Sequence, residues 1–369
     1  MAKISFAYST KKSSLVLSKN NMRSDSGQNS GQKTSGQNGY KVGVIGAGAW
    51  GTALSVIANR AGSKVTLGTR NSSVISAVRD RRINDIYLPS IFIDPSVAFT
   101  DELSDVCHND VLILATPSHC LRAVCISISD SLPPTVPIVI ASKGIERGSL
   151  MMMSEVVKAI LPNNPIAILS GPNFADEAAR GLPTATTIAC ADTSLWDMLM
   201  YSIGGRLFRP YMTEDVIGTQ IGGIVKNVIA IACGIAVGKN MGENARAALV
   251  TRGFAEMSRL ALAKGGKYET LMGLSGLGDL ILTCGSQKSR NMSFGVALGQ
   301  GKSKDELLAI SGRGALEGVV SAESIDKLAG KYSISMPICE AVHHILYDNA
   351  PIDRVISGLL ERPFVSEAI

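Results

Sequence analysis

The stretch "KVGVIGAGAWGTALSVIANRAG", residues 41–62, constrains the fold of this 369-residue chain more than any other. Its branched apolar start predicts a buried strand. The apolar residues from Trp50 onward recur every three or four positions, which predicts a helix ending at Gly62. Between strand and helix stand three glycines in the spacing GxGxxG. This order is typical of the first unit of an open, mostly parallel α/β sheet.

Each glycine has a predicted role. Gly46 makes the turn, Gly48 lets the backbone approach the pyrophosphate of a dinucleotide, and Gly51 lets the helix pack closely on the strand. The pyrophosphate would then meet free N–H groups in the first helical turn, at Ala49 and Trp50. Two alternatives stay open, namely a glycine turn that binds no ligand and an S-adenosylmethionine site with the same turn.

The second strand, "KVTLGTRN", carries a clue about which dinucleotide binds. An Asp or Glu about 20 residues after the glycines would read the ribose 2′-hydroxyl of NAD. Arg70 stands there instead and suits the 2′-phosphate of NADP, although it can equally be a solvated loop arginine. The expected cofactor is therefore NAD(H) or NADP(H).

The order of the segments predicts an α/β protein with a second, all-α part. Short branched apolar runs alternate with helical patterns from Lys41 to about Pro210, whereas helical periodicity dominates from Val216 onward. We predict a low-complexity tail over 1–40, a Rossmann-like, mostly parallel dinucleotide-binding domain over 41–212, and a helical substrate and catalytic domain over 213–369.

The composition argues against several partners. The net charge of +5 resides in residues 1–40, which carry six basic residues and one acidic residue, so the rest is balanced and predicts no nucleic-acid binding. This tail contains a degenerate SGQ repeat, which predicts disorder, and a basic, serine-rich start that suits either a targeting segment or a mis-assigned start before Met22. The longest apolar run, 228–238, is too short for a membrane span and predicts a core helix.

Cysteines and histidines indicate a reducing compartment and no metal. The seven cysteines form no CxxC pair, so buried free thiols in the cytoplasm are expected. The four histidines lack metal-ligand spacing, and no metal site is predicted.

Two loops after predicted strands carry candidate ligands. "IVIASKGIE" places Lys143 just after a strand, and "AILSGPNFADEAARG" leads from a strand through Gly171 and Asn173 into a helix. Ligands of open α/β sheets bind at such strand ends. The alternatives are a surface lysine and an ordinary turn.

"GGIVKNVIAIACG" places Lys226 in an apolar helix, on one face with Gly222, Gly223, Ala230, Cys233 and Gly234. Small neighbours leave room for a small or flat ligand, and burial near other cations would lower the lysine pKa toward the range of a general base. Alternatively, Lys226 reaches solvent from a domain edge.

"LSGLGDLILTCGSQKSRN" places Asp279 after a glycine-rich turn and Ser289, Arg290 and Asn291 at the start of a helix. Arg290 and Asn291 can hold a phosphate there. The alternative is a helix capped by Ser289 with a solvated arginine beside it.

Taken in order, the motifs GAGAWG, ASKG, SGPNFADE, GGIVKNVIAIACG, NARAALVTRGFAEM, SGLGDL, SRN and ALEG closely resemble those of bacterial-type NAD(P)-dependent glycerol-3-phosphate dehydrogenases. The resemblance covers about residues 41–365. It implies a two-domain enzyme that interconverts dihydroxyacetone phosphate and sn-glycerol 3-phosphate for phospholipid synthesis. We also expect a homodimer.

The resemblance also assigns residues. Lys226 falls on the position of the proton-transferring lysine. Our own hypothesis adds that Lys143 helps to polarise the substrate oxygen and that Asp279 orients Lys226 or a substrate hydroxyl. Cofactor-contacting positions are Trp50, Arg70, Lys143, Ala175, Arg290, Ala315 and Glu317. Substrate-contacting positions are Lys143, Gly171, Asn173, Lys226, Asp279, Ser289, Arg290 and Asn291.

Three positions depart from the family pattern. Asn173 stands where Ser or Thr is usual, Gln220 where Glu is usual, and Ala315-Leu316 where two valines often stand. Asn173 can still bond substrate, whereas the other two departures put fine cofactor geometry in doubt.

Two rival functions make different predictions. Another lysine-using dehydrogenase with a hydroxy-acid substrate would recognise a carboxylate in place of a phosphate. A nucleotide-sensing binding protein would have no turnover, and the joint presence of Lys143, Lys226 and Asp279 argues against it.

Overall fold

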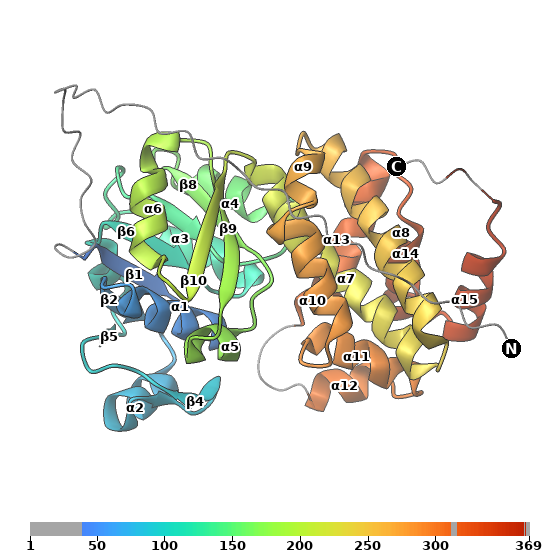
Figure 1. Cartoon of the computed structure of the whole chain (residues 1–369), viewed down its shortest axis with the longest axis horizontal. Helices are drawn as coiled ribbons and strands as arrows, with labels where there is room; N and C mark the ends of the chain where they lie inside the picture. Colours follow the sequence, from blue (N-terminus) through green and yellow to red (C-terminus); the bar gives the residue numbers. More distant parts are fainter. Residues whose placement is uncertain (1–38, 311–315, 365, 367–369) are drawn as a thin grey trace, which may run out of the picture. The chain divides into compact units, whose positions relative to one another are not determined.

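The computed structural model describes residues 39–310, 316–364 and 366. The predicted tail lies outside these residues apart from its last two, as does Ala315. Figure 1 shows a sheet with its helices, coloured blue to green, beside a helical part coloured yellow to red. The predicted fold class, a mostly parallel sheet domain followed by a helical domain, is confirmed.

Within the described residues one sheet has the strand order β10-β9-β8-β7-β6-β1-β2-β5. Neighbouring strands are parallel except for β8 and β9, which are antiparallel. The strands are β1 (Lys41–Ile45), β2 (Lys64–Gly68), β5 (Ala98–Thr100), β6 (Val111–Leu114), β7 (Ile138–Ile140), β8 (Ile166–Ser170), β9 (Thr184–Cys190) and β10 (Phe208–Thr213). A separate antiparallel pair, β3 (Ile83–Asn84) and β4 (Leu88–Phe92), lies between β2 and β5 in the sequence.

Alternating side chains place two apolar cores on the two faces of the sheet. Along β6, Val111 and Ile113 belong to one core, and Leu112 and Leu114 to the other. Because both faces are covered, the strands have continuous apolar sequences. The covering helices are α1 (Ala49–Arg60), α2 (Ser72–Arg81), α3 (Leu121–Ile128), α4 (Met153–Ile160), α5 (Ala175–Arg180) and α6 (Trp196–Ile203).

The sequence pattern does not predict β10, because Pro210 and Arg209 interrupt its apolar run. The structure accommodates Pro210 because β10 is an edge strand, where a missing N–H costs no ladder bond. The predicted domain boundary at Met212 falls within this strand.

The helical part is organised around α7 (Val216–Gly238), whose N-terminus Asp215 caps by accepting the N–H of Gly218. This helix is long and apolar enough to cross a membrane, but 89% of its most apolar stretch is buried inside the protein, so it is a core helix. Around it lie α8 (Gly242–Ala263), α9 (Tyr268–Leu271), α10 (Asp279–Gly285), α11 (Arg290–Gly299), α12 (Lys304–Ile310), α13 (Glu317–Lys331), α14 (Pro337–Tyr347) and α15 (Ile352–Leu360).

Helices α7 and α11 touch backbone to backbone through paired glycines. A Cβ atom at Gly234 would lie 2.2 Å from the carbonyl oxygen of Met292, and one at Gly295 would lie 2.2 Å from that of Ile231. No other residue type fits such an approach without a shift of the helices. This contact fixes the start of α11 beside the middle of α7.

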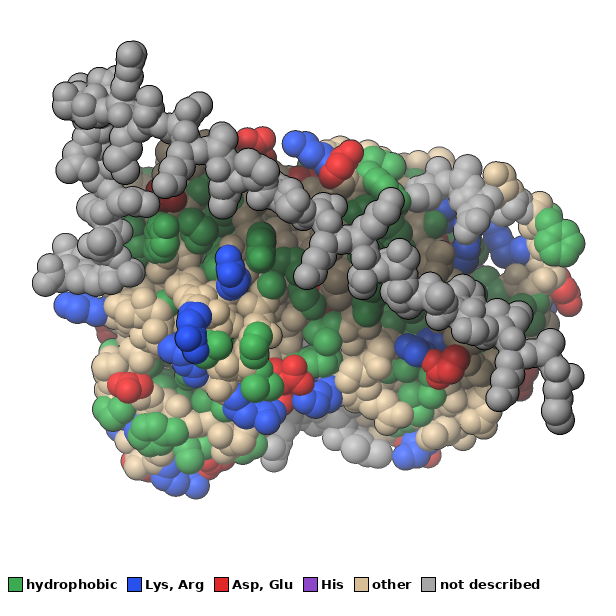
Figure 2. Space-filling model, viewed as in Figure 1, with side chains coloured by type: hydrophobic (Ala, Val, Ile, Leu, Met, Phe, Trp, Pro, Cys, Tyr) green, Lys and Arg blue, Asp and Glu red, His purple; other side chains and the backbone are tan. Residues whose placement is uncertain are grey.

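Charged side chains of both signs are interspersed with apolar ones over the described surface that Figure 2 shows.

Candidate active site

The glycine turn joins β1 to α1. Gly46 has a φ of +111°, and a Cβ atom there would lie 2.7 Å from the carbonyl oxygen of Ala115. A Cβ atom at Gly51 would lie 1.8 Å from the carbonyl oxygen of Gly46. At Gly48, by contrast, a Cβ atom would meet no atom of the described residues within 4 Å. The fold itself thus requires Gly46 and Gly51, whereas Gly48 borders open space.

The residues around this space fit a dinucleotide phosphate. Gly48 is the N-cap of α1 and no side chain caps the helix, so the first N–H groups, at Ala49 and Trp50, are available to an anion. Thr116, whose backbone nitrogen would lie 3.0 Å from a Cβ atom at Gly46, has a buried hydroxyl without a partner among the described residues. A buried orphan hydroxyl beside free N–H groups suits a polar ligand.

Asn84 braces the glycine turn from a distant segment, and the sequence gives no spacing signal for it. Its fully buried side-chain amide donates to the carbonyl oxygen of Ala47 at 2.9 Å and to the hydroxyl of Thr52 at 2.8 Å. These two hydrogen bonds connect the glycine turn to the segment that follows α2.

The remaining residues assigned to the cofactor lie around the same end of the sheet, apart from Ala315, which is outside the described residues. Trp50 and Ala175 pack against one small apolar cluster that includes Ala53 and Leu88. Arg70 is exposed in the bend after β2, next to Asn71, which caps α2. Arg70 therefore remains available to a ligand from solvent.

Lys143, Lys226 and Asp279 meet where the sheet adjoins the helical part. The Nζ atom of Lys226 donates to Oδ1 of Asp279 at 2.5 Å, and Nζ of Lys143 donates to Oδ2 of the same carboxylate at 2.8 Å. Asp279 is 1% exposed and Lys226 8% exposed. Thr283, one turn further along α10, donates its hydroxyl to Oδ1 of Asp279 at 3.4 Å. One buried carboxylate thus serves two lysines.

Burial sets the protonation equilibrium of Lys226. Removal of its ammonium group from water lowers the pKa to about 8, with the positive charge of Lys143 acting in the same direction and Asp279 opposing both. The group can therefore give up or take a proton near neutral pH.

The small residues beside Lys226 let neighbouring parts of the protein pack closely against α7. A Cβ atom at Gly222 would lie 2.3 Å from the carbonyl oxygen of Ser275, and one at Gly223 would lie 2.6 Å from the hydroxyl oxygen of Ser170 and 3.3 Å from the Cδ atom of Lys143. The predicted free stripe along α7 is therefore largely filled by protein, because the glycines let neighbouring backbone approach.

The loop between β8 and α5 brings Gly171 and Asn173 to the same region. A Cβ atom at Gly278, just before Asp279, would lie 3.7 Å from the Cγ atom of Pro172. The Nδ2 group of Asn173 donates to the carbonyl oxygen of Ala185 at 2.9 Å, while its Oδ1 atom is buried without a partner among the described residues. The unpartnered oxygen is a candidate acceptor for a substrate hydroxyl.

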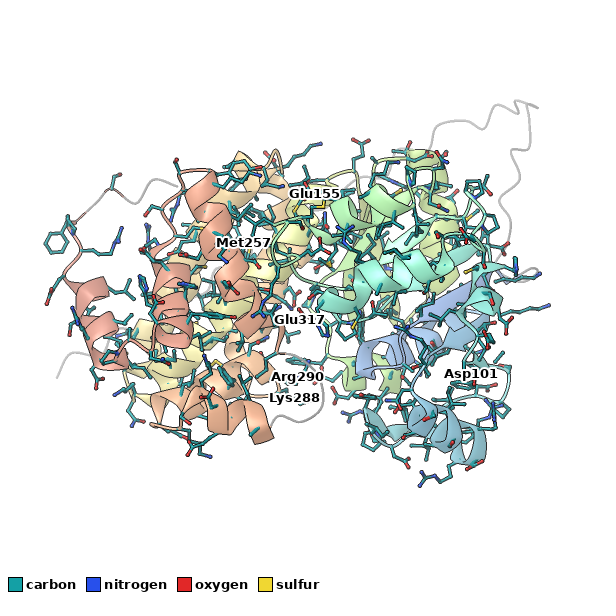
Figure 3. The ribbon with its side chains drawn as sticks, turned by 180° about the vertical axis from the view of Figure 1, so that it is seen from behind. Asp101, Glu155, Met257, Lys288, Arg290 and Glu317 are labelled. Carbon is teal, nitrogen blue, oxygen red and sulfur yellow. The ribbon has the colours of Figure 1, made fainter. Side chains whose placement is uncertain are left out.

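The start of α11 contributes Ser289, Arg290 and Asn291. Ser289 caps the helix by accepting the N–H of Met292 at 3.3 Å. Asn291 donates to Oδ1 of Asn227 at 3.0 Å and accepts the N–H of Gly318 at 3.1 Å, so its side-chain oxygen is already used. Arg290 is exposed at the first helical position. Figure 3 shows Arg290 and Lys288 on the side of the helical part that faces the sheet, with Glu317 nearby.

Glu317 begins α13 and reaches the sheet. Ser118, which follows β6, donates its hydroxyl to Oε2 of Glu317 at 2.8 Å and its backbone N–H to Oε1 at 3.3 Å. Burial raises the pKa of Glu317, and the two hydrogen bonds from Ser118, with smaller effects of His119 and Arg290, partly offset this rise. Sequence patterns give no indication of this contact between residues 199 positions apart.

Gln220 lies on α7 and lines a small cavity together with Lys143 and Gly144, so its predicted effect on cofactor geometry stays a prediction. Its Oε1 atom accepts the N–H of Ser154 at 3.0 Å and its Nε2 group donates to the hydroxyl of Ser154 at 2.9 Å. Gln220 thus fastens α7 to the start of α4.

The side chain of Asn227, one residue after Lys226, is a further site neighbour that the sequence does not single out.

Comparisons with known proteins agree with this geometry. The family profiles described as "NAD-dependent glycerol-3-phosphate dehydrogenase N-terminus" and "C-terminus" match residues 41–196 and 215–357. The "Glycerol-3-phosphate dehydrogenase [NAD(P)+]" of Maricaulis maris is 50% identical over 327 residues, which is 88% of this chain and 98% of that protein. The protein of the same name from Caulobacter vibrioides is 48% identical, covering 89% of this chain and 99% of its own.

A crystal structure of glycerol-3-phosphate dehydrogenase from Coxiella burnetii superimposes with a TM-score of 0.84 at 37% identity, covering 88% of this chain and 99% of that one. The resemblance predicted from the motifs is thereby confirmed. The chain belongs to the family of NAD(P)-dependent glycerol-3-phosphate dehydrogenases, which are oxidoreductases.

Proposed function

We propose that the chain interconverts dihydroxyacetone phosphate and sn-glycerol 3-phosphate, with Lys226 as the general acid and base. The observation that carries this proposal is the pair of hydrogen bonds from Lys226 and Lys143 to the buried carboxylate of Asp279. This group lies close to the substrate loop of Gly171, because a Cβ atom added at Gly278 would be in van der Waals contact with Pro172.

The dinucleotide belongs at the glycine turn, where Gly48 leaves space and the start of α1 is uncapped. When bound, NAD(P)H supplies the hydride for C2 of the substrate. Arg70, Trp50, Ala175, Arg290 and Glu317 are the further residues that we assign to its binding. Arg70 is compatible with a 2′-phosphate, so both NADH and NADPH are expected to bind.

Lys226 moves the proton. In the reduction it donates a proton from Nζ to the oxygen at C2 as the carbonyl becomes an alkoxide, and in the oxidation neutral Lys226 takes the proton of that hydroxyl. Lys143 supplies a second positive charge beside the same oxygen. Asp279 holds both ammonium groups in place, and its negative charge limits how far burial depresses the pKa of Lys226.

The substrate phosphate is assigned to the start of α11. Arg290 provides a fork of N–H donors, and the backbone N–H groups of the first turn add further donors. The bonded side chain of Asn291 positions this turn against α7 and α13. Ser289, Gly171 and Asn173 complete the proposed substrate contacts.

The cellular setting is part of the same proposal. Supply of glycerol phosphate for phospholipid synthesis, a cytoplasmic location and a homodimer are all expected of this chain. The division into a dinucleotide-binding region ending near Met212 and a substrate region after it also remains our proposal, supported by the change from sheet to helices between Thr213 and Val216.

The test follows nicotinamide absorbance with NADH and NADPH in parallel, and offers dihydroxyacetone phosphate, unphosphorylated dihydroxyacetone and a 2-keto acid as substrates. We expect turnover of the first. Arg290→Ala should lower kcat/KM for dihydroxyacetone phosphate by roughly ten- to a hundredfold, because a charge-assisted contact to the phosphate is lost. The value of kcat/KM for unphosphorylated dihydroxyacetone should fall less.

Lys288→Ala is the matched control, because Lys288 adjoins Arg290 in the chain but bonds to Glu177 of α5 at 2.5 Å. It should retain the preference for the phosphorylated substrate. Turnover of the keto acid with none of dihydroxyacetone phosphate would reject the proposed function.

A further inference from the structure

The contact between Ser118 and Glu317 connects the sheet with the helical part at the edge where the glycine turn lies. Ser118 follows β6, the strand that pairs with β1, and Glu317 is the first residue of α13. The serine is 5% exposed and directs both its hydroxyl and its backbone N–H to the two oxygens of one carboxylate. A carboxylate held by two donors has a fixed orientation.

The surrounding residues are shaped around this contact. Gly144, directly after Lys143, has a φ of +157°, and a Cβ atom there would lie 2.6 Å from Cβ of Ser118 and 3.3 Å from Oε2 of Glu317. The lysine loop therefore passes against the serine and carboxylate only because residue 144 has no side chain. The orphan hydroxyl of Thr116 lies two residues before Ser118 on the same loop.

Fold and charge both place this carboxylate toward a ligand. Ligands of open α/β sheets bind beyond the carboxyl ends of the strands, which is where the loops of Ser118 and Gly144 emerge. Desolvation of a carboxylate is costly, and within the described residues Ser118 is the one side chain that donates a hydrogen bond to Glu317.

We propose that Ser118 is a positioning residue for the dinucleotide, which holds the carboxylate of Glu317 in the orientation that binds the cofactor. Resting on the assignment of Glu317 to the cofactor site in the proposed function, this role concerns binding of NAD(P)H and not the transfer of the proton. The substrate contacts at α11 are independent of it.

The experiment measures NADPH binding to the full chain by calorimetry, without substrate, for the wild type, Ser118→Ala, Ser118→Thr and Glu317→Gln. Ser118→Ala should weaken binding about tenfold, the effect of one hydrogen bond to a charged group. Ser118→Thr, which keeps the hydroxyl, should recover most of the affinity. In turnover, the KM for NADPH should rise by the same factor while kcat at saturation stays within about twofold.

The double variant Ser118→Ala with Glu317→Gln tests whether the serine acts through the glutamate. We expect the serine change to have little further effect once Glu317 is Gln, because interacting residues give non-additive losses. The control Ser127→Ala removes a hydroxyl on nearby α3 that donates only to the carbonyl oxygen of Val124 in its own helix. It should bind NADPH as the wild type does.

Three outcomes would overturn the proposal. They are wild-type affinity in Ser118→Ala, an undiminished effect of that change in the Glu317→Gln background, and an equal loss of affinity and of thermal stability in both Ser118→Ala and Ser118→Thr. Binding is measured without substrate, so these outcomes would reject the role of Ser118 and leave the proposed reaction standing. Absence of turnover with intact NADPH binding would count against the proposed function alone.

Discussion

At the scale of single residues, the site depends on how three charges share one buried position. Two lysines and one aspartate carry a net positive charge, and burial acts against it. Both lysines bond to the single carboxylate of Asp279, and burial lowers the pKa of Lys226 to about 8. A lysine with this pKa is charged in most molecules at neutral pH and yet loses its proton readily.

This pKa predicts opposite pH profiles for the two directions of the reaction. Reduction needs the protonated amine, so its kcat/KM should fall as pH rises through about 8, while kcat/KM for oxidation of glycerol 3-phosphate should rise over the same interval. Initial rates from pH 6 to 10 in both directions measure this. Profiles that are flat around pH 8 in both directions would contradict the role of Lys226.

Some of the site can be predicted at this scale and some cannot. Lys226 stands out because a lysine in an apolar helix is costly unless it has a function or a partner. Its partner Asp279 is 53 positions away in the sequence. The glycines around both residues are as consistent with ordinary turns as with a ligand site. Ser118 and Asn84 give no signal, because serine and asparagine in loops are common and their partners come from distant segments.

At the scale of elements, the strand, turn and helix at residues 41–62 can be read from sequence almost completely. Local periodicity and three glycines determine it, and in the structure close backbone contacts require Gly46 and Gly51 whereas Gly48 borders open space. The edge strand β10 and the contact of α7 with α11 cannot be read in this way. Edge position allows a proline in β10, and the glycine pairs of α7 and α11 gain meaning only when the helices are side by side.

The glycine turn makes a prediction that separates folding from binding. Gly48→Ala adds a methyl group that meets no protein atom among the described residues, in a backbone conformation that alanine adopts freely, so the unfolding temperature should be unchanged. The same methyl group points into the proposed phosphate site, so NADPH affinity should fall at least tenfold. Calorimetric binding and thermal unfolding measure the two effects.

Gly51→Ala is the matched comparison. Its methyl group would lie 1.8 Å from the carbonyl oxygen of Gly46, so the helix must shift and the unfolding temperature should drop by several degrees. If Gly48→Ala lowered stability and left NADPH affinity intact, the assignment of the open space to the cofactor would be wrong.

At the scale of the whole molecule, the described sheet and helical part are joined by polar contacts on several elements. Lys264, the C-cap residue of α8, bonds to Glu155 of α4 at 3.0 Å, and Glu155 is labelled in Figure 3 where α4 meets the helices. With Gln220 and the pair of Ser118 and Glu317, these contacts hold the residues of the site together. The fold class follows from the sequence, but these individual contacts do not, because they involve exposed or polar side chains without periodicity.

One buried carboxyl group links the stability of the whole molecule to pH. Glu256 of α8 is 1% exposed and accepts the N–H groups of Ile338 and Cys339 at the start of α14, at 2.7 and 3.1 Å. Burial outweighs these bonds and raises the pKa of Glu256 from 4.5 to about 7. The folded protein therefore binds the proton more tightly than the unfolded chain.

The direction in which stability changes with pH follows from this difference in proton affinity between the folded and unfolded states. The penalty for ionising Glu256 is absent below pH 4.5 and complete above about pH 7, so this group should reduce stability by about 3 kcal/mol as pH rises across the interval. Glu256→Gln should remove this part of the pH dependence in denaturant unfolding. An unchanged slope of stability against pH in the variant would show that Glu256 titrates normally.

The central claim, proton transfer by Lys226, is tested most directly by the rate of hydride transfer in Lys226→Ala at saturating NADPH and dihydroxyacetone phosphate, with NADPH affinity measured on the same sample. We predict a loss of about 10² to 10⁴ in rate. NADPH affinity should stay within about threefold, and a small added primary amine should restore part of the rate. A rate within tenfold of the wild type, with no response to added amine, would contradict the account.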